Sequence, residues 1–472
     1  MIEALRSAPL VAAAAAALPD ADAWIVGGAV RDAALGEEVS DLDLTLPGDV
    51  AGAARRLARG LGGHAFELSA EFSTWRVVAG GGQLDLTPLH QGSIEADLAA
   101  RDFTIGAIAV PLGGGGVRDP YDGLGDLERR LLRAVGERSF AEEPLRLLRA
   151  TRLAANLGLA LDPGTVELAR AVAPRAGEPA GERQLAELRQ LLGGPDPLRG
   201  LRLMDELGVT AVVLPEVADL HGVGQGPNHH LDVHGHTLAV LEHTLEIEAD
   251  LERFTGARAP EVAELLAEPL ADEVSRGTAL RFGALFHDIA KPLTRQERDG
   301  FVGFRGHDAA GAELIEEIFA ARLRASRRLT RHLQALTLHH LRLGFLIPER
   351  PLSRRRVYDY LRVTDPVGVD VTLLTVADRL SARGAGPLAS SEMVSAHLDL
   401  ASEMVAAALD WRRDGPPPPL LRGDEIATAL DLEPGPDLGE AVAELEAAQY
   451  AGEVSDRESA LAHLARLVSE PG

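Results

Sequence analysis

The start of the fold is decided by the stretch Val26-Gly27-Gly28-Ala29-Val30-Arg31-Asp32, which is followed by Asp41-Leu42-Asp43-Leu44. A strand that runs into two glycines lets backbone N–H groups approach a triphosphate, because no side chains stand in the way. Arg31 adds a cation near the phosphates. Alternation along the next strand puts Asp41 and Asp43 on one face. Two carboxylates placed in this way can hold Mg²⁺ against a nucleoside triphosphate, which suits displacement by a 3′-hydroxyl.

Short apolar runs with glycine punctuation continue through the first 140 residues and predict a small sheet. The predicted strands are Ala23–Val26, Leu42–Leu46, Trp75–Val78, Leu84–Leu86 and Ile105–Val110. Gly113–Gly116 is predicted to be a loop. Asp85, at the centre of one of these runs, is a candidate third catalytic carboxylate, although an aspartate near a strand end is equally ordinary as a structural residue.

These stretches together resemble the polymerase-β-type nucleotidyltransferases, and specifically the bacterial class II tRNA nucleotidyltransferase/poly(A) polymerase family. The segment Arg101-Asp102-Phe103-Thr104-Ile105-Gly106-Ala107 is similar to the family segment R-R-D-F-T-I-N-A, with Ala100 in place of the first arginine. The resemblance implies that Arg101 and Asp102 contact the nucleotide. Further similar segments are residues 119–127, 182–188, 421–425, 432–436 and 452–454. The resemblance therefore covers nearly the whole chain.

The segment from Glu142 to Arg152 resembles the family motif E-D-P-x-R-x-L-R. Glu143 and Arg146 are three residues apart, which predicts one helical face, and Arg149 and Arg152 extend that spacing. The resemblance implies that Glu143 and Arg146 hydrogen-bond the edge of the incoming base and act as a protein template, while Arg149 and Arg152 meet the phosphates. Glu143 stands where aspartate is usual, so its longer side chain is expected to alter base selection.

A second group of residues follows the order H…HD…H…H…D, which resembles the HD phosphohydrolase superfamily. The predicted ligands are His236, His287, Asp288, His307, His339 and Asp378. Imidazole and carboxylate together suit a divalent cation, and a chain without cysteine favours Mn²⁺, Ni²⁺, Mg²⁺ or Fe²⁺ over structural Zn²⁺. If His287 and Asp288 lie on a helix they are ~100° apart, so both can reach one metal. The surplus histidines between His221 and His307 are expected to be structural or exposed.

Length alone predicts about three domains. The resemblance, together with the change from strand to helix patterns, implies an α+β protein with four parts. These are a polymerase-β-like nucleotidyltransferase head with a small mixed sheet (1–140), an all-α neck that selects nucleotide and binds RNA (141–220), an HD domain (221–410) and a helical tRNA-binding tail (420–472). Pro215 predicts a break between helices. The run from Gly415 to Pro419 predicts a stiff linker before the tail.

The net charge of −25 is the wrong sign for an enzyme that binds nucleic acid. Thirteen arginines between Arg129 and Arg202 form either a basic groove or an ion-paired surface, and charge alone favours the ion pairs. No apolar stretch approaches the ~18 residues of a membrane span, and Val11–Leu18 lacks the layout of a secretory signal. A cytoplasmic location without membrane contact is therefore expected. The absence of cysteine excludes disulfides.

The predicted function is template-independent addition of CMP and AMP, from CTP and ATP, to the 3′ end of tRNA with Mg²⁺. The HD site is predicted to use Ni²⁺ or Mn²⁺, or Mg²⁺, to hydrolyse phosphomonoester or 2′,3′-cyclic phosphate ends of RNA. One alternative is a poly(A) polymerase, which the acidic tail around Glu440 and Glu444 disfavours. Another is an HD phosphohydrolase or RNA-binding protein with an inactive head, which the intact Asp41 and Asp43 disfavour.

A third alternative is addition of CC alone. In family members that complete CCA, a flexible loop between the carboxylate strand and the R-R-D segment helps the site switch from CTP to ATP. Here fifteen residues separate Asp85 from Arg101, and Ser93 is expected to cap a helix that leads into Arg101. That leaves roughly six residues, too few for a mobile lid. The shortening resembles members that add only CC and leave the terminal A to a separate enzyme.

Overall fold

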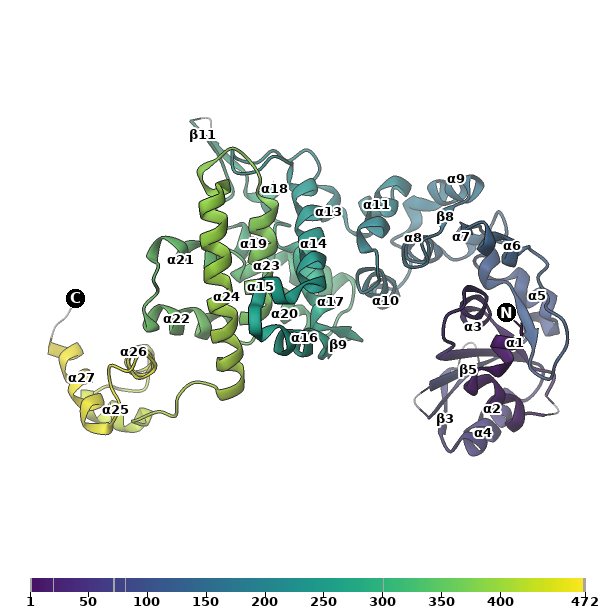
Figure 1. Ribbon diagram of the computed structural model, residues 1–472, viewed down its shortest axis with the longest axis horizontal. Helices are drawn as coiled ribbons and strands as arrows, with labels where there is room; N and C mark the ends of the chain where they lie inside the picture. The colour runs from purple at the N-terminus through teal and green to yellow at the C-terminus, as the bar shows by residue number, and fades with distance from the viewer. Residues whose placement is uncertain (1, 20, 71–72, 81, 300, 470–472) are drawn as a thin grey trace. The chain divides into compact units, whose positions relative to one another are not determined.

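The computed structural model describes residues 2–19, 21–70, 73–80, 82–299 and 301–469. The chain forms two compact units, Met1–Val213 and Leu214–Gly472. The first combines a mixed sheet with helices and the second is almost entirely helical (Figure 1). The predicted α+β class is confirmed. Among the described residues no helix is both long enough and apolar enough to cross a membrane.

A six-stranded sheet with the order β3-β4-β5-β2-β1-β6 forms the centre of the first unit. Its strands are β1 (Trp24–Val26), β2 (Asp41–Leu46), β3 (His64–Ser69), β4 (Thr74–Ala79), β5 (Gly82–Pro88) and β6 (Ala109–Pro111). Strands β2 and β5 are parallel, whereas the other neighbouring pairs are antiparallel. Strand β2 is buried on alternate residues up to Leu44, which is the pattern expected of a strand with one face on the core.

The helices of this part are α1 (Ile2–Ser7), α2 (Pro9–Ala17), α3 (Gly28–Leu35), α4 (Val50–Leu61), α5 (Ile94–Ala99) and α6 (Gly123–Glu128). Helix α4 buries Ala53, Ala54 and Leu57, and it packs on β3 and β4. Helix α5 begins after Ser93, whose Oγ accepts a hydrogen bond from the N–H of Ala96 at 3.1 Å. The predicted cap at Ser93 is thereby confirmed.

Two strand predictions need correction. The predicted strand Ile105–Val110 is wrong in its first half, because residues 104–106 form a 3₁₀ turn, η2 (Thr104–Gly106), and β6 starts only at Ala109. Strand β3 was not predicted. It lies at the edge of the sheet and leaves Phe66 and Leu68 exposed, so it lacks the alternation that marks a half-buried strand.

The neck consists of α7 (Ser139–Glu142), α8 (Arg146–Asn156), α9 (Pro163–Val172), α10 (Gly181–Leu192), α11 (Pro197–Leu207) and α12 (Thr210–Val213), with a short parallel pair, β7 (Leu131–Leu132) and β8 (Ala160–Leu161). The prediction that Glu143 and Arg146 share a helical face is wrong. Glu143 is extended, with φ −144° and ψ 91°, and α8 begins only at Arg146. Pro144 explains the break, because proline disfavours helical geometry in the residue before it.

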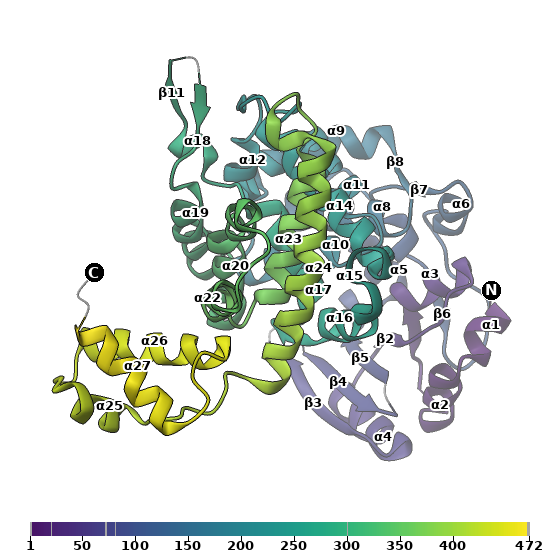
Figure 2. The same cartoon turned by 60° about the vertical axis from the view of Figure 1, so that its left-hand side comes forward.

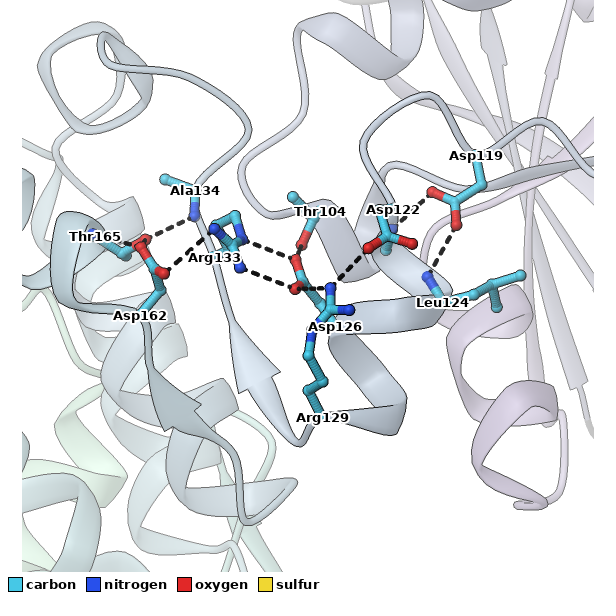
Figure 3. A network of polar contacts seen from close by, with 11 residues as sticks. Thr104, Asp119, Asp122, Leu124, Asp126, Arg129, Arg133, Ala134, Asp162 and Thr165 are labelled. Carbon is cyan, nitrogen blue, oxygen red and sulfur yellow. Dashed lines mark hydrogen bonds and ion pairs between the residues drawn. The ribbon is translucent and has the colours of Figure 1, made fainter.

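A buried carboxylate joins the end of the sheet region to the neck (Figure 3). Asp126 is fully buried, and it accepts hydrogen bonds from Thr104 at 2.7 Å, from Arg129 at 2.8 Å and from Arg133 at 3.1 Å. Arg133 also lies 3.3 Å from Asp162, the residue that precedes α9. Thr104 lies two residues after Asp102, so this network fixes the Arg101-Asp102 segment relative to the neck.

The second unit contains α13 (Pro215–Ala218), α14 (Val233–Ala249), α15 (Leu251–Thr255), α16 (Ala259–Ala267), α17 (Arg276–Phe286), α18 (Lys291–Thr294), α19 (His307–Ile315), α20 (Arg327–His339), α21 (Arg342–Leu346), α22 (Arg354–Thr364), α23 (Gly368–Ser381) and α24 (Ser391–Asp414). Helices α14, α17 and α23 pack on one another, and α24 runs along α23 (Figures 1 and 2). The predicted helix break before Pro215 is confirmed, since α12 ends at Val213 and Pro215 starts α13.

Two small hairpins interrupt this helical unit and were not predicted. They are β9 (Pro269–Ala271) with β10 (Val274–Ser275), and β11 (Gln296–Arg298) with β12 (Phe301–Gly303). The second hairpin projects from the end of α18 (Figure 2). Phe301 on it is 74% exposed, so no hydrophobic period marks it in the sequence.

The tail consists of α25 (Gly423–Leu430), α26 (Pro436–Ala451) and α27 (Arg457–Ser469), and a non-helical linker from Gly415 precedes it, as predicted. A small core that includes Ile426, Leu445 and Leu464 holds the three helices together. The tail attaches to α22 through polar contacts. Arg355 lies 2.7 Å from Glu444 and 2.8 Å from Glu453.

Candidate functional site

Three carboxylates gather on one face of the sheet in the first unit. Alternation along β2 exposes Asp41 and Asp43 and buries Leu42 between them. The parallel pairing of β2 with β5 puts Asp85 directly beside Asp43. The structure therefore brings together the three acids that the sequence singled out.

Gly27 lies against these acids and has to be a glycine. Its φ is +69°, which side chains rarely adopt, and a Cβ there would lie 2.9 Å from Asp43 Oδ2 and 3.2 Å from the Arg101 guanidinium. Helix α3 begins at Gly28 and carries Arg31, which pairs with Asp32 at 2.7 Å. The glycine turn, the acid and the arginine from a distant segment thus meet at one place.

The arginines around these acids do not fully compensate their negative charge, so the acids attract a cation. Arg76 binds Asp85 through two hydrogen bonds, of 2.8 and 2.7 Å, and Arg101 binds Asp97 at 2.9 Å. The pKa of Asp43 is raised, because the surrounding protein displaces water from its carboxylate and the neighbouring Asp85 adds repulsion, while Arg101 opposes both effects. An acid group in this condition gains from a divalent cation, which would relieve the repulsion and restore the lost solvation.

Residues of the neck hold the Ala100-Arg101-Asp102 segment. Arg146 donates hydrogen bonds to the Ala100 carbonyl at 2.7 Å and to the Ser139 carbonyl and hydroxyl at 3.1 Å. Arg149 pairs with Asp102 at 2.7 Å, and the Ser139 hydroxyl donates to the Asp102 carbonyl. Arg146 therefore spends three of its N–H groups on positioning this segment.

A cavity of about 330 Å³ opens between the segment and the neck. It is lined by Ala100, Arg101, Asp102, Glu143, Leu145, Arg146, Arg149 and Arg183. Five predicted nucleotide-contacting residues meet there. Arg152 is absent from this lining, and it instead pairs with Glu187 at 2.6 Å in a largely buried contact. Arg183 was not predicted by itself, although it lies in the family-like segment 182–188, and it binds the Glu143 carboxylate at 3.0 Å.

The second unit holds two adjoining groups of candidate metal ligands. His236, His287 and Asp378 form one, and Asp288, His307 and His340 form the other, with the ligating atoms of each group within 4.8 Å of one another. Asp288 lies between the groups. Its Oδ2 is 3.0 Å from His287 Nε2, and its Oδ1 is 3.2 Å from His307 Nε2. One carboxylate can thus serve cations on both sides.

The prediction that His339 is a ligand needs correction. The Nδ1 of His339 accepts a hydrogen bond from Arg342 at 2.9 Å, whereas the ring of its neighbour His340 belongs to the second group. The rotation of this helix end turns His340 toward the site and His339 toward Arg342. The placement of His287 and Asp288 on a helix is also wrong, because α17 ends at Phe286 and both residues follow in the turn.

The histidine rings are oriented for metal binding. The Nδ1 atoms of His287, His307 and His340 lie 2.9, 2.7 and 2.6 Å from the backbone carbonyls of residues 284, 304 and 337. With Nδ1–H donating to a carbonyl, Nε2 is the ring nitrogen left to bind a metal once it is deprotonated. Among the described residues, His236 Nδ1 is buried without a hydrogen-bond partner. The residues present therefore fit a divalent metal.

The buried carboxylate of this site is ionised, and at least one of its imidazoles is neutral. Burial alone would raise the pKa of Asp288, but the charges of His287 and Lys291 hold it well below its usual value. Burial lowers the pKa of His340 to about 4, and the charge of His287 acts in the same direction. A neutral imidazole beside an ionised carboxylate is the protonation state that metal binding requires.

The sequence reasoning missed Lys291 and His229. Lys291 Nζ lies 2.6 Å from Asp288 Oδ2, donates to the Gln225 side chain at 2.6 Å, and lies over the Phe304 ring. Its signal was available, because it is the one lysine among 47 basic residues. His229 was treated as surplus, but its ring meets the edge of the His236 ring at 4.6 Å.

Three protein-family models match successive parts of the chain. A poly A polymerase head domain matches residues 23–92 and 89–133, and a probable RNA and SrmB-binding site of polymerase A matches 158–220. An HD domain matches 233–383.

Curated relatives match over nearly their full length. An A-adding tRNA nucleotidyltransferase from Deinococcus radiodurans is 38% identical over 95% of this chain and 96% of its own. A CC-adding tRNA nucleotidyltransferase from Thermus thermophilus is 36% identical over 94% of this chain and 93% of its own. Among solved structures, a Thermotoga maritima CCA-adding enzyme complexed with tRNA covers 98% of both chains, with a TM-score of 0.58 and 19% identity. That likeness shows a shared fold.

Proposed function

Because the chain belongs to the family of tRNA nucleotidyltransferases, we propose that it adds CMP residues to the 3′ end of tRNA and stops before the terminal AMP. One observation carries this proposal. Strand β5 ends at Pro88 and α5 begins at Ile94, so only the five residues 89–93 connect them. This is where the resemblance implies a flexible loop in members that change from CTP to ATP.

The connection is also pinned along its length. The N–H of Leu89 donates to the Leu46 carbonyl at 3.1 Å, and the N–H of Gly92 donates to the Leu89 carbonyl at 3.2 Å. Ser93 then caps α5. A change from cytosine to adenine requires new contacts around a larger base, with a different pattern of donors and acceptors. A short segment with fixed hydrogen bonds supports one base geometry and resists such a change.

In the proposed reaction, the 3′-hydroxyl of the tRNA attacks the α-phosphorus of CTP, a P–O bond forms, and pyrophosphate leaves. Asp41 and Asp43, with Asp85 beside them, would hold Mg²⁺, which supplies charge neutralisation at the phosphates. Gly27, Gly28 and Arg31 would meet the triphosphate. Arg101, Asp102 and Arg149 would also contact the nucleotide, and Arg152 would add positive charge behind Arg149.

Base selection is assigned to Glu143, with Arg146 beside it. Since Arg146 is already bonded to Ala100 and Ser139, and Arg183 binds the Glu143 carboxylate, the exposed edge of this trio is what a base would meet. Guanidinium and carboxylate groups can discriminate cytosine from adenine by their donor and acceptor patterns.

Addition of A alone is the second candidate, and one finding favours it, namely the 38% identity to the A-adding relative. Two substrates separate the candidates: tRNA that ends at the discriminator base, and tRNA that ends in CC. Each is incubated with labelled CTP, labelled ATP or both. CC addition predicts two CMP residues on the first substrate and no rapid AMP addition to the second. Rapid AMP addition to the CC-ended tRNA alone supports the second candidate, while activity on both restores CCA addition. Long AMP runs would indicate a poly(A) polymerase.

We also propose that the second unit is a phosphohydrolase that acts on phosphomonoester or 2′,3′-cyclic phosphate ends of RNA. The support is the convergence of His236, His287 and Asp378 with Asp288, His307 and His340. A divalent ion such as Ni²⁺, Mn²⁺ or Mg²⁺ would supply an activated water there. Phosphate release from 3′-phosphorylated or cyclic-phosphate RNA, measured with each metal, tests the proposal. No release with any of them, from protein shown to bind metal, would contradict it.

A further inference from the structure

Four arginines cluster at the start of α20. Arg324 lies just before the helix, and Arg327, Arg328 and Arg331 lie on its first turns. All four side chains are exposed, while Leu329 and Thr330 are buried. Arg327 and Arg331 are four residues apart and Arg328 and Arg331 are three apart, so these side chains share one side of the helix. We call these four residues the α20 arginine cluster.

In the described part of the chain, this cluster brings four exposed arginines without an acidic partner into eight residues. Within the part of the chain that the structure describes, none of its four side chains has a hydrogen bond, an ion pair or a ring contact. Nearby on α22, by contrast, Arg356 binds Glu349 at 2.7 Å. The chain carries 72 acidic and 47 basic residues, so acidic partners are plentiful. Four unpaired guanidiniums within eight residues therefore run against the charge balance of the whole chain.

The position of these arginines at the N-terminus of a helix is a further unfavourable electrostatic effect when no ligand is bound. The N-terminus of an α-helix carries a partial positive charge, which repels cations in its first turn. The end is also fixed in place. The Ser326 hydroxyl caps it by accepting from the N–H of Leu329 at 3.3 Å, and the N–H of Ser326 donates to Asp272 at 2.8 Å. A rigid frame thus holds together charges that repel one another, and an anionic ligand would relieve that repulsion.

We infer that the α20 arginine cluster binds the sugar-phosphate backbone of tRNA. The inference rests on the family's substrate and places a contact in the second unit, outside residues 158–220 that match the RNA-binding family model. Arginine is suited to this contact, since its planar fork binds phosphate oxygens in pairs. The cluster reads no base, so its contribution is to affinity and orientation and not to nucleotide choice.

The test compares two variants of equal charge. In the cluster variant, Arg324, Arg327, Arg328 and Arg331 become glutamine. In the control, four exposed arginines that each have an acidic partner become glutamine, namely Arg295, Arg356, Arg412 and Arg413. Both variants lose four positive charges, so a general effect of net charge is the same in each. A third variant, with lysine at the four cluster positions, keeps the charge.

Binding of tRNA is measured between about 50 and 200 mM KCl, and the logarithm of the association constant is plotted against that of the salt concentration. Each lost phosphate contact lowers the magnitude of the slope by about 0.7–0.9. If two to four of the arginines contact phosphates, the magnitude of the slope for the cluster variant falls by about 1.4–3.6, and the variant binds tRNA at least tenfold more weakly at low salt. The control keeps the wild-type slope, and the lysine variant keeps most of it.

Nucleotide transfer at saturating tRNA is expected to stay at the wild-type rate in the cluster variant, because the transfer residues lie in the other unit. This readout separates the inference from the proposed function. If the wild-type protein does not add CC, only the proposed function is contradicted. A cluster variant with the same slope and affinity as the control contradicts the inference and indicates that an acidic protein, or no ligand, occupies the cluster.

Discussion

This chain has two polar centres, the carboxylates on the sheet and the histidine and aspartate ligands of the helical unit. The carboxylates of the two centres have different surroundings. On the sheet, Asp41 and Asp43 are exposed as residues, but protein around the carboxylate of Asp43 displaces water from it and raises its pKa. In the helical unit, Asp288 is buried, and neighbouring positive groups hold its pKa well below the usual value. The negative charge of the first centre is only partly compensated by neighbouring cations. The negative charge of the second is largely compensated by its own side chains.

That difference indicates how each centre meets its metal. Acids that repel one another in an open site gain most when a cation arrives with a triphosphate, so metal and substrate are expected to bind together on the sheet. Imidazoles whose Nδ1 atoms are fixed on backbone carbonyls are organised before any metal binds. The helical unit is therefore expected to retain a metal ion, whereas the sheet exchanges it at every turnover.

The largest effect is expected for Asp43→Asn. Loss of a metal-ligating carboxylate removes charge stabilisation worth several kcal/mol, so nucleotide addition should fall by at least about a thousandfold at any Mg²⁺ concentration. Stability should move the other way. A carboxylate with a raised pKa costs folding free energy above its unfolded pKa, so the neutral amide should leave the metal-free protein as stable as wild type or more stable.

Single-turnover transfer assays and urea unfolding at pH 7 check both parts. Asp49→Asn is the control, because Asp49 lies on the same unit and only caps α4. Near-normal addition by Asp43→Asn would contradict the site, and a large loss of stability would contradict the proposed repulsion among the acids.

The second prediction sharpens the assignment of the helical centre. His340→Ala should abolish phosphate release and lower the metal content of the purified protein, since His340 belongs to the ligand group. His339→Ala should preserve both, because His339 binds Arg342 instead. Metal content is read by elemental analysis, and nucleotide addition serves as the control for each variant. Equal losses in the two variants would mean that the helix end is rotated from the position described.

The same residues show how much of the two sites could be predicted from the sequence. Gly27, Asp41 and Asp43 were predictable, because strand alternation and a required positive φ are local properties. The pairing of Asp85 with Asp43 depends on β2 and β5 being parallel neighbours, which no local pattern shows. The choice of His340 over His339 depends on the rotation of a helix end, which packing against other helices sets.

Two further errors have physical reasons. A helical spacing was assumed across Pro144, although proline disfavours helix in the preceding residue and Glu143 is extended. Lys291 was not singled out, because its contact with Asp288 depends on the conformation of the turn after α17, which the sequence does not show. In both cases the residue that decided the outcome lies close to the motif. Pro144 directly follows Glu143, and Lys291 lies three residues after Asp288.

The third prediction tests whether Lys291 balances the helical centre when no metal is bound. Its ammonium lies 2.6 Å from the buried Asp288 carboxylate, so Lys291→Met leaves a buried charge with less compensation and should cost about 3 kcal/mol of unfolding free energy. A bound divalent ion supplies that compensation, so Mn²⁺ should restore much of the loss. Urea unfolding with Mn²⁺ and with a chelator measures this. Arg298→Met, an exposed position, is the control, and an equal loss under both conditions would contradict the role.

The smallest effect is expected for Ser93→Ala, which asks whether the short connection really fixes the open centre. The Ser93 hydroxyl caps α5, and α5 carries Asp97, which holds Arg101 at 2.9 Å. Loss of an N-cap costs about 1 kcal/mol. If the cap keeps Arg101 at the nucleotide cavity, its loss should raise the KM for CTP by up to about fivefold, while kcat and phosphate release stay unchanged. Ser93→Thr keeps a capping oxygen and should behave like wild type. A loss of stability without any change in KM would mean that Arg101 is held by the neck and not by the connection.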